Sequence, residues 1–537
     1  MSENSRLYDY LIVGSGLYGA VFAYLARRRG RRCCVLGLSL LLMLAALPVY
    51  GQEYRLDWDV SLSAAGATTG ALPFWAVTGK NGIVPSTHSA FAVAGTDFTY
   101  SSRPGVKVYA GFKLSGSMIP AALSAVGAAP AIRGYEAAGP ASRTWRGAVN
   151  ELYAGVGWKM LRLDLGMIDR ETGYGGLSLT GGNIVWSGNT RSVPGYNLQV
   201  DWVEIPGTRG IFALKANYAD YKMLDDRYVD GPLLHNKSLF ARFRLHSRVH
   251  LTLGLEQWSM WGGTSPRNGK QPQSFSDYIR VVCGMSGGKD ATLSDQINVL
   301  GDHRGRELIQ VDWAADRFTL TFAHDIPFDD GSGMGFQNFP DGVNTLCLAF
   351  NDKDRWVNEI LYEFVFTKCQ SGSRHDRPAK PDELERDPDK KTYIIGGNDN
   401  YFNNGEYRSG WTYYGRTAGL PLFTPMPADA DGLVTGICNN RVVAHHIGIG
   451  GKFARRIPYR FKATYSRNYG QYSQRMDMFD SVPEQLSLAL EVDFPRFSRK
   501  FPVSVSVGAY GDVGELYQDS FGLVLRLSYA GRLAGGR

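Results

Sequence analysis

The chain has 537 residues, of which 20% are charged and 12% aromatic, and its mean hydropathy is −0.21. This composition excludes a bundle of transmembrane helices, which needs long apolar runs. Residues 1–51 hold +4 of the net charge of +7, which leaves +3 for the rest of the chain and excludes the basic surface of a nucleic-acid-binding protein. The 64 glycines and 29 tyrosines favour strands, turns and aromatic belts.

The N-terminal segment contains a glycine motif. A predicted strand at 8–13 runs into Gly14, Gly16 and Gly19, and a predicted helix at 20–29 and a second strand at 32–36 follow. Glycines at this spacing let a pyrophosphate approach the helix N-terminus in dinucleotide-binding βαβ units. The segment is similar to the N-terminus of the UDP-galactopyranose mutase family, flavoenzymes that bind FAD in this way.

This similarity covers only residues 7–36 and stops before a flavin domain is complete. Gly37 stands where an acidic residue is expected to bind the ribose hydroxyls. We therefore expect residues 1–32 to be a truncated dinucleotide-binding-like extension with a vestigial motif, and the chain to use no cofactor. A mutase-like FAD protein is the alternative from a different functional class.

A second N-terminal signal overlaps the first. Basic residues at 27–32 precede an apolar run from Cys33 to Leu47, and Val49-Tyr50-Gly51 follows. A basic region, a short apolar run and a small-residue cleavage site together predict a secretory signal peptide, with its hydrophobic region at 33–51. We expect export and a mature chain that begins at Gln52, with an uncleaved anchor as the alternative.

From Glu53 onwards, alternating strand patterns dominate, most clearly at 238–263. Successive side chains of a strand point to opposite faces. One face of this hairpin is apolar and the other is polar: Leu239, Ala241, Phe243 and Leu245 alternate with Phe240, Arg242, Arg244 and His246, and the pattern resumes after a tight turn. Similar strand patterns recur along the chain, at 152–165, 309–322, 459–466 and 486–507.

The strands are joined by short turns and long polar segments in alternation, the pattern of outer-membrane barrels. The last strand, 521–529, ends on Tyr529 and is similar to the assembly signal of such barrels. The sequence therefore predicts an all-β, transmembrane antiparallel outer-membrane β-barrel over residues 52–529, with a C-terminal tail at 530–537.

Cysteines do not indicate a metal site. Cys283, Cys347, Cys369 and Cys438 are widely spaced and form no CxxC pair. In an exported chain they can form one or two disulfides, or remain free thiols, and the sequence leaves both readings open. No G-x-S-x-G motif is present, so hydrolase chemistry is not supported.

Several short motifs occur in a characteristic order over residues 55–530. They are Pro73-Phe74-Trp75 with Asn81-Gly82, 187–194, Asp226–Val229, Leu234–Ser238, Gly254–Glu256 with Trp261–Gly263, Gly301–His303, Tyr362-Glu363 with Thr367 and 370–372, Asp399–Asn404 and Gly410–Thr412. In this order they resemble the capsule assembly family of outer-membrane proteins (the Wzi type), in its Bacteroidetes-like form.

The resemblance implies a barrel of about 18 strands that binds and organises capsular polysaccharide at the cell surface, as a lectin and not an enzyme. It implies a monomer in the outer membrane whose partners are surface polysaccharide, outer-membrane lipid and the barrel-assembly machinery. A porin-like glycan channel is the alternative, and it differs in having an open lumen.

Two groups of residues are candidates for glycan contact because they combine aromatic rings with planar amides or carboxylates. They are Asp399, Asn400, Tyr401, Asn403, Trp411 and Tyr413, and separately Glu256, Trp258 and Trp261. For each single residue, a turn for Asn and Asp or the interfacial girdle for Trp and Tyr is the competing interpretation. Lumenal Arg242, Arg244 and Glu363 are expected to brace the barrel interior or to meet an acidic glycan.

Overall fold

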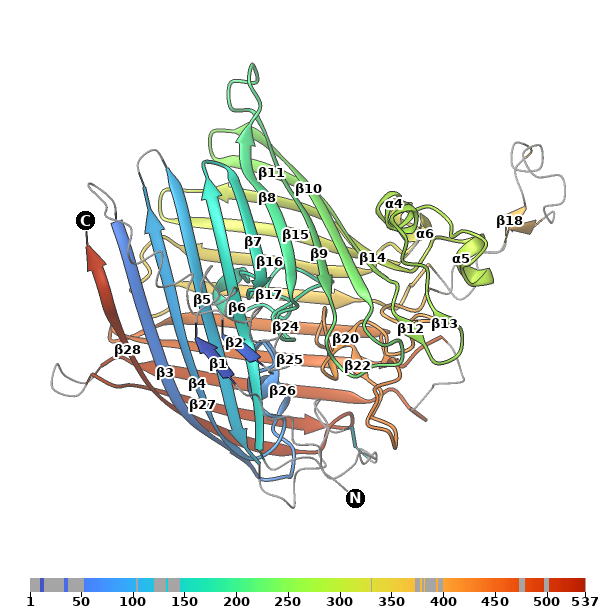
Figure 1. The fold of residues 1–537 in the computed structure, drawn as a ribbon. Helices are drawn as coiled ribbons and strands as arrows, with labels where there is room; N and C mark the ends of the chain where they lie inside the picture. Colours follow the sequence, from blue (N-terminus) through green and yellow to red (C-terminus); the bar gives the residue numbers. More distant parts are fainter. Residues whose placement is uncertain are drawn as a thin grey trace.

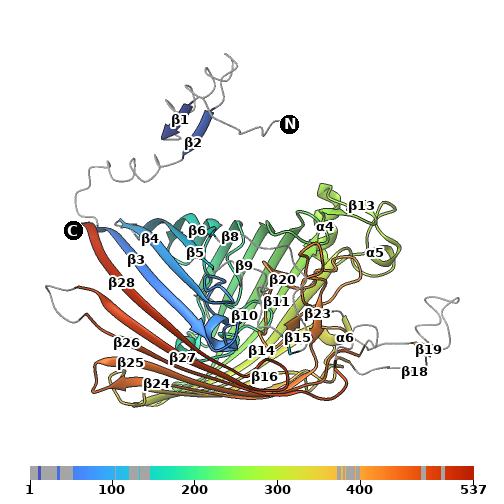
Figure 2. The ribbon, with the colours of Figure 1, turned by 90° about the horizontal axis from the view of Figure 1, so that it is seen from below.

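The computed structural model describes residues 10–13, 33–36, 53–102, 105–119, 132–133, 145–329, 331–371, 377–378, 381, 393–394, 399–472, 479–496 and 502–536. Its main feature is a closed barrel of 18 strands (Figures 1 and 2). The barrel strands are β3 (Glu53–Ala67), β4 (Ser89–Ser101), β5 (Val106–Met118), β6 (Trp145–Trp158), β7 (Leu161–Met167), β8 (Gly195–Glu204), β9 (Phe212–Lys222), β10 (Leu233–His246), β11 (Val249–Trp261), β14 (Asp302–Ala314), β15 (Phe318–Phe328), β16 (Gly342–Phe350), β17 (Glu359–Phe366), β24 (Val442–Phe453), β25 (Ile457–Asn468), β26 (Glu484–Phe494), β27 (Ser504–Gly514) and β28 (Ser520–Gly536).

Each barrel strand pairs antiparallel with its neighbours in the chain, and β28 pairs with β3 to close the ring. Closure removes the unpaired edges that an open sheet would expose. The predicted all-β antiparallel barrel of about 18 strands is confirmed. The last strand runs further than expected, because residues 530–536, assigned to a tail, continue β28 along β3 as far as Tyr54.

The two ends of the barrel differ in the length of their connections. One end has tight turns such as 159–160, 247–248 and 315–317, whereas the other carries segments such as 168–194, 262–301 and 367–441. Helices and short strands occur in these long segments: α3 (Phe74–Val77), η2 (Tyr174–Gly176), α4 (Phe275–Cys283), α5 (Leu293–Ile297), α6 (Gly331–Met334), β12 (Thr264–Ser265), β13 (Gly269–Lys270), β18 (Arg377–Pro378), β19 (Tyr393–Ile394), β20 (Thr412–Tyr413), β21 (Arg416–Thr417), β22 (Thr424–Pro425) and β23 (Ile437–Asn439).

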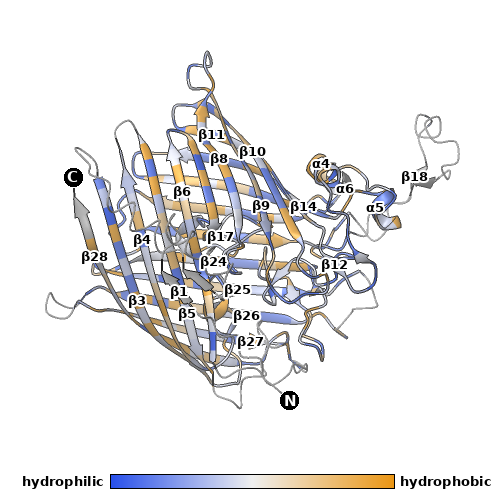
Figure 3. Ribbon diagram, in the orientation of Figure 1, coloured by the Kyte–Doolittle hydropathy of each residue, from blue (hydrophilic) through white to orange (hydrophobic). Residues whose placement is uncertain are grey.

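The β10–β11 hairpin follows the predicted alternation. Leu239 and Leu245 point outward and are 53% and 62% exposed, whereas Thr252 and Glu256 point inward and are buried. Alternating apolar and polar residues are visible along the strands in Figure 3. An apolar outer face and a polar inner face are the arrangement of outer-membrane barrels.

Outside the barrel, β1 (Tyr10–Val13) and β2 (Cys33–Leu36) pair in parallel. Their pairing agrees with the two strands predicted on either side of the glycine motif. Gly14, Gly16, Gly19, the predicted helix at 20–29 and the predicted cleavage site lie outside the described residues. Among the helices of the described residues, none has the length and apolar character needed to cross a membrane.

The lumen is packed by the barrel's own long segments. Apolar side chains from the segments 68–88, 168–194 and 399–441 meet inward-facing wall residues in one large cluster that contains Trp75, Trp258 and Trp411. Polar contacts hold α3 against the wall, since the Phe74 amide donates to Asp512 at 2.8 Å and the Trp75 indole donates to Thr464 at 3.1 Å. The barrel therefore contains a core of its own.

Candidate functional site

The segment 168–194 between β7 and β8, here called the lumenal loop, is fixed to the wall by buried carboxylates. Glu363 of β17 accepts hydrogen bonds from the Ser178 hydroxyl at 2.5 Å and the Leu179 amide at 2.8 Å. Asp325 of β15 accepts from the Ile184 amide at 2.8 Å. Inward-facing acids thus satisfy backbone donors that the loop buries.

Arg306 of β14 joins two of the wall acids. Its Nε donates to Glu256 at 2.9 Å, and its Nη1 donates to Asp325 at 3.1 Å and to the Gly182 carbonyl at 2.6 Å. All three charged side chains are almost completely buried. A buried charge is tolerated when it is paired and hydrogen-bonded, so this cluster is a structural unit that the loop completes.

Arg170 of the lumenal loop extends the cluster toward a free space. Its guanidinium lies over the Trp258 ring, 4.5 Å from the centroid, and donates to the Tyr221 hydroxyl at 2.9 Å. A Glu256 oxygen is 3.7 Å from the same group. The side chain of Arg170 is 31% exposed, so its charge is available at the surface of that space.

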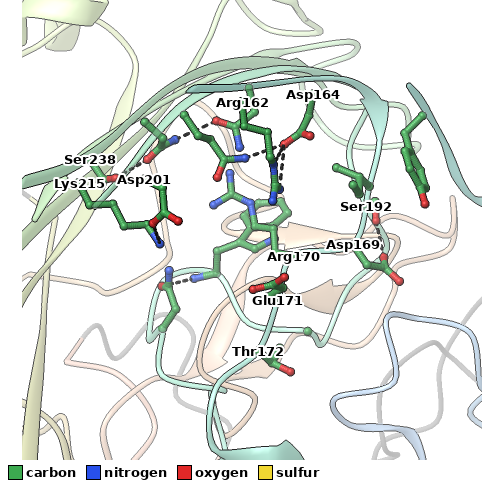
Figure 4. A pocket seen from close by; sticks show the side chains of 18 of the residues that line it. Arg162, Asp164, Asp169, Arg170, Glu171, Thr172, Ser192, Asp201, Lys215 and Ser238 are labelled. Atoms are coloured by element: carbon green, nitrogen blue, oxygen red, sulfur yellow. Dashed lines mark hydrogen bonds and ion pairs between the residues drawn. The ribbon is translucent and has the colours of Figure 1, made fainter. Parts of the chain in front are cut away.

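This space is a cavity of about 910 Å³ inside the barrel, between the lumenal loop and β4 to β11. Figure 4 shows Arg162 and Asp164 on the wall and Arg170 and Glu171 on the loop around it. The cavity reaches the short-turn end, because Gly105 and Lys159 line it. In outer-membrane barrels that end faces the periplasm.

The lining combines aromatic rings with planar hydrogen-bonding groups. Tyr109, Tyr153, Tyr221, Phe240, Asn197, Gln199 and Asn217 are among the lining residues. The Asp164 carboxylate accepts hydrogen bonds from the Gln199 amide at 2.6 Å and from the Arg162 guanidinium at 3.0 Å. Aromatic faces beside amides and hydroxyls suit a polyhydroxylated ligand. Among the described residues no group of His, Cys, Asp and Glu has the arrangement of a metal site.

The structure separates the predicted glycan residues of β11. Glu256 and Trp258 line the cavity, as inward-facing residues two positions apart. Trp261 is three positions after Trp258, so its side chain points to the opposite, outer face of the wall. There it packs under α4 with Val281 and Leu300. Among the predicted lumenal charges, Glu363 holds the lumenal loop.

The other two predicted lumenal charges make different contacts. Arg242 lies 3.7 Å from the centroid of the Trp202 ring. Arg244 is exposed and donates to the Arg209 carbonyl of a short turn at 2.6 Å. Neither forms part of the cluster around Arg306, so the three predicted lumenal charges make separate local contacts.

The predicted glycan residues at 399–413 lie in the interior of the loop cluster. The rings of Tyr401, Trp411 and Tyr413 are at most 1% exposed. Asn403 donates to and accepts from the backbone of Ile437, and Asn400 accepts from the Asn403 amide at 2.9 Å. Asp399 accepts from the Ser371 hydroxyl at 2.5 Å. The turn interpretation therefore describes this group better.

Sequence reasoning missed Arg170, Arg306 and Asp325 because each lies in a different strand or loop. The sequence did contain one sign of this loop: the segment 168–194 between two strands is 27 residues long. Arg416 was also missed. It donates to the carbonyls of Val77 and Val84 at 3.1 and 3.0 Å, and burial, together with the neighbouring Arg191 charge, lowers its pKa to about 10.

Asp341, just before β16, is expected to make stability depend on pH. It accepts hydrogen bonds from the Gln370 amide and the Tyr401 hydroxyl, but burial raises its pKa to about 6. The folded chain then keeps a proton that the unfolded chain loses near pH 4. Stability should fall as pH rises from about 4 to about 6, by up to about 3 kcal/mol.

The difference in free energy of unfolding between the wild type and Asp341→Asn, measured across this range, isolates the effect from other carboxylates. We expect the free energy of unfolding of the wild type to fall, relative to that of Asp341→Asn, as the pH rises. A difference that is constant between pH 4 and pH 6.5 would show that Asp341 titrates normally.

Protein-family models and curated protein sequences give no match to this chain. Among solved structures, the chain is similar to Wzi from Escherichia coli, described as a carbohydrate-binding β-barrel involved in group 1 capsule assembly, with a TM-score of 0.50 and 13% identity over 91% of this chain and 86% of Wzi. It is also similar to OprD from Pseudomonas aeruginosa, with a TM-score of 0.42 and 10% identity over 90% of this chain and 96% of OprD.

At this identity the similarity to Wzi shows the fold alone, an 18-strand barrel of the outer-membrane type. None of these comparisons supports the resemblance of residues 7–36 to UDP-galactopyranose mutase.

Proposed function

We propose that this chain is an outer-membrane barrel that binds and organises capsular polysaccharide, without catalysis and without a cofactor, and that it holds the glycan at the periplasmic end of the lumen. The observation that carries the proposal is the cavity of about 910 Å³, which lies inside a closed barrel and is lined by aromatic rings and planar polar groups. The fold is similar to that of Wzi, whose description as a carbohydrate-binding barrel supports the same assignment.

We assign the glycan to the cavity beside Arg170, whose side chain is 31% exposed, and not to the buried rings at 401–413. Trp258 and Glu256 are 1% and 4% exposed and hold the Arg170 guanidinium from behind. Arg170 offers a planar cation for a carboxylate or hydroxyl pair. Tyr109 and Tyr153 offer ring faces along the wall. An acidic polysaccharide would use both kinds of contact.

Binding of purified capsular oligosaccharide to the full chain in vesicles tests the proposal. Replacing Arg170 with methionine keeps the apolar stem over Trp258 and removes the charge and donors, so we expect about a tenfold loss of affinity. Arg248→Met, in an exposed short turn, is the matched control and should bind normally. Failure of the wild type to bind any capsular oligosaccharide, or equal binding by both variants, would contradict the proposal.

A glycan channel is the second candidate, because the cavity occupies part of the lumen and extends to the short-turn rim. A channel predicts steady ion current across a planar bilayer that added oligosaccharide blocks. A binding barrel whose lumen is packed by its own loops predicts little current. The two functions are therefore separated by one recording.

A further inference from the structure

The outer face of β9, β10 and β11 changes from apolar to polar toward the long-loop end. Leu239 and Leu253 point outward and are exposed. On the same face of β10, two and four residues before Leu239, lie Lys237 and His235, and Asp220 of β9 is opposite His235 in the register. Polar and charged groups on the outer face of a membrane barrel would meet lipid, which is costly.

These polar groups are covered by α4. The Tyr278 hydroxyl of α4 donates to Asp220 at 2.8 Å, and the same carboxylate is 2.8 Å from Nδ1 of His235. The Lys237 ammonium donates to the Val282 carbonyl at the end of α4. His235 is consequently only 1% exposed although it points away from the lumen. The helix thus replaces lipid as the neighbour of this polar patch.

The segment 262–301, here called the outer-wall segment, is built to hold α4 in this position. Ser274 and Asp277 form a capping box at the start of the helix, and Gly284 ends it with a φ of 64°. The side of α4 that faces the wall contributes Val281 to a small cluster with Trp261. Helix ends with satisfied donors and a packed inner face define a stable element.

Both helices of the outer-wall segment expose large apolar side chains. Phe275 is 77% exposed, Leu293 72% and Ile297 73%, and Ile279 lies one turn after Phe275 on α4. Figures 1 and 2 show α4 and α5 to one side of the barrel wall, and Figure 3 shows apolar residues on both helices. Such a grouping of large apolar side chains in water is unfavourable and marks an interaction surface.

We propose that the outer-wall segment is a membrane-interface element, in which the apolar side of α4 and α5 lies in the outer leaflet. The occupant is lipid, because this surface continues the outward row of Leu239 and Leu253 and covers the polar patch that interrupts it. An amphipathic helix with one apolar side lies in the plane of the interface in this way. The inference rests on the outer-membrane placement in the proposed function.

A fluorescent label tests the depth of the segment. The full chain carries Cys33→Ser, Cys34→Ser, Cys283→Ser and Cys369→Ser, and NBD is attached at Phe275→Cys or, in a second variant, at Leu293→Cys. After folding into phosphatidylcholine vesicles, we expect both labels to be quenched by doxyl-labelled lipid and protected from iodide by at least severalfold. A label at Ser247→Cys, in an exposed short turn, is the control and should show the reverse.

Labels at 275 and 293 that iodide quenches as strongly as at 247 would overturn the inference. Protection that is lost on dilution of the protein, without sensitivity to doxyl lipid, would indicate a second copy of the chain and would also overturn it. Heat-modifiable migration of each variant reports folding of the barrel separately. If no variant inserts or shows this migration, the outer-membrane placement itself is wrong.

Discussion

Replacing Arg306 with methionine is expected to release the lumenal loop and to lower the free energy of unfolding by about 3 to 5 kcal/mol. Arg306 is the shared partner of Glu256 and Asp325, and it also donates to the Gly182 carbonyl of the loop. Without it, two carboxylates remain buried with one counter-charge, Arg170, at 3.7 Å from Glu256. The loop then loses one of its links to the wall, the hydrogen bond from Arg306 to the Gly182 carbonyl.

Two measurements check this expectation. Denaturant unfolding in vesicles gives the loss of stability, and bilayer recording shows whether the released loop opens the lumen to ions. Arg306→Lys should lie between the wild type and the methionine variant, because a lysine keeps the charge but not the two-sided geometry.

Arg242→Met is the matched control for Arg306→Met, since Arg242 points into the same lumen but contacts the Trp202 ring. We expect it to keep the low ion current that the proposed function predicts for the wild type. Wild-type stability and low current in Arg306→Met would show that the lumenal loop is held by other contacts.

The second large loss of stability is expected at Trp411, whose side chain packs against other buried rings in the structure. Its indole donates to the Val185 carbonyl at 2.7 Å, and its ring packs edge-on against Trp186 and Trp258 at 5.8 and 5.9 Å. Trp411→Ala should therefore destabilise the chain by about 3 to 5 kcal/mol through the cavity that it leaves. Denaturant unfolding measures the loss.

An exposed tryptophan provides the control. Trp356 lies in a short turn and is 65% exposed, so Trp356→Ala should change stability by no more than about 0.5 kcal/mol. If Trp411→Ala kept its stability but lost oligosaccharide binding, Trp411 would be a contact residue after all, and the assignment of the glycan to the cavity would be wrong.

Strand alternation predicted the barrel only together with the number of hairpins, the preceding signal segment and the pattern of the connections. The inward and outward positions of β10 and β11 follow from the sequence because neighbouring side chains point to opposite faces. The alternation of short turns with long segments likewise predicted which connections would be tight. The number of strands came from the resemblance to a family, and the closed ring of 18 agrees with it.

The candidate site was predicted only in part. Glu256 and Trp258 line the cavity because their parity on β11 points them inward. Trp261 has the opposite parity on β11 and therefore points outward to α4. The composition of the Asp399–Asn404 segment suits both a sugar-binding loop and a buried turn, and only the packing of the long segments against one another decided for the turn.

The sequence by itself determined the strand faces, which follow from a period of two residues within each strand, and the two unequal ends, which follow from the lengths of the connections. Only the tertiary structure decided that the lumenal loop folds inward onto Glu363, Asp325 and Arg306, and that the outer-wall segment folds outward over Asp220 and His235. Such contacts join residues far apart in the chain, so no local pattern specifies them; the need to pair buried polar groups does.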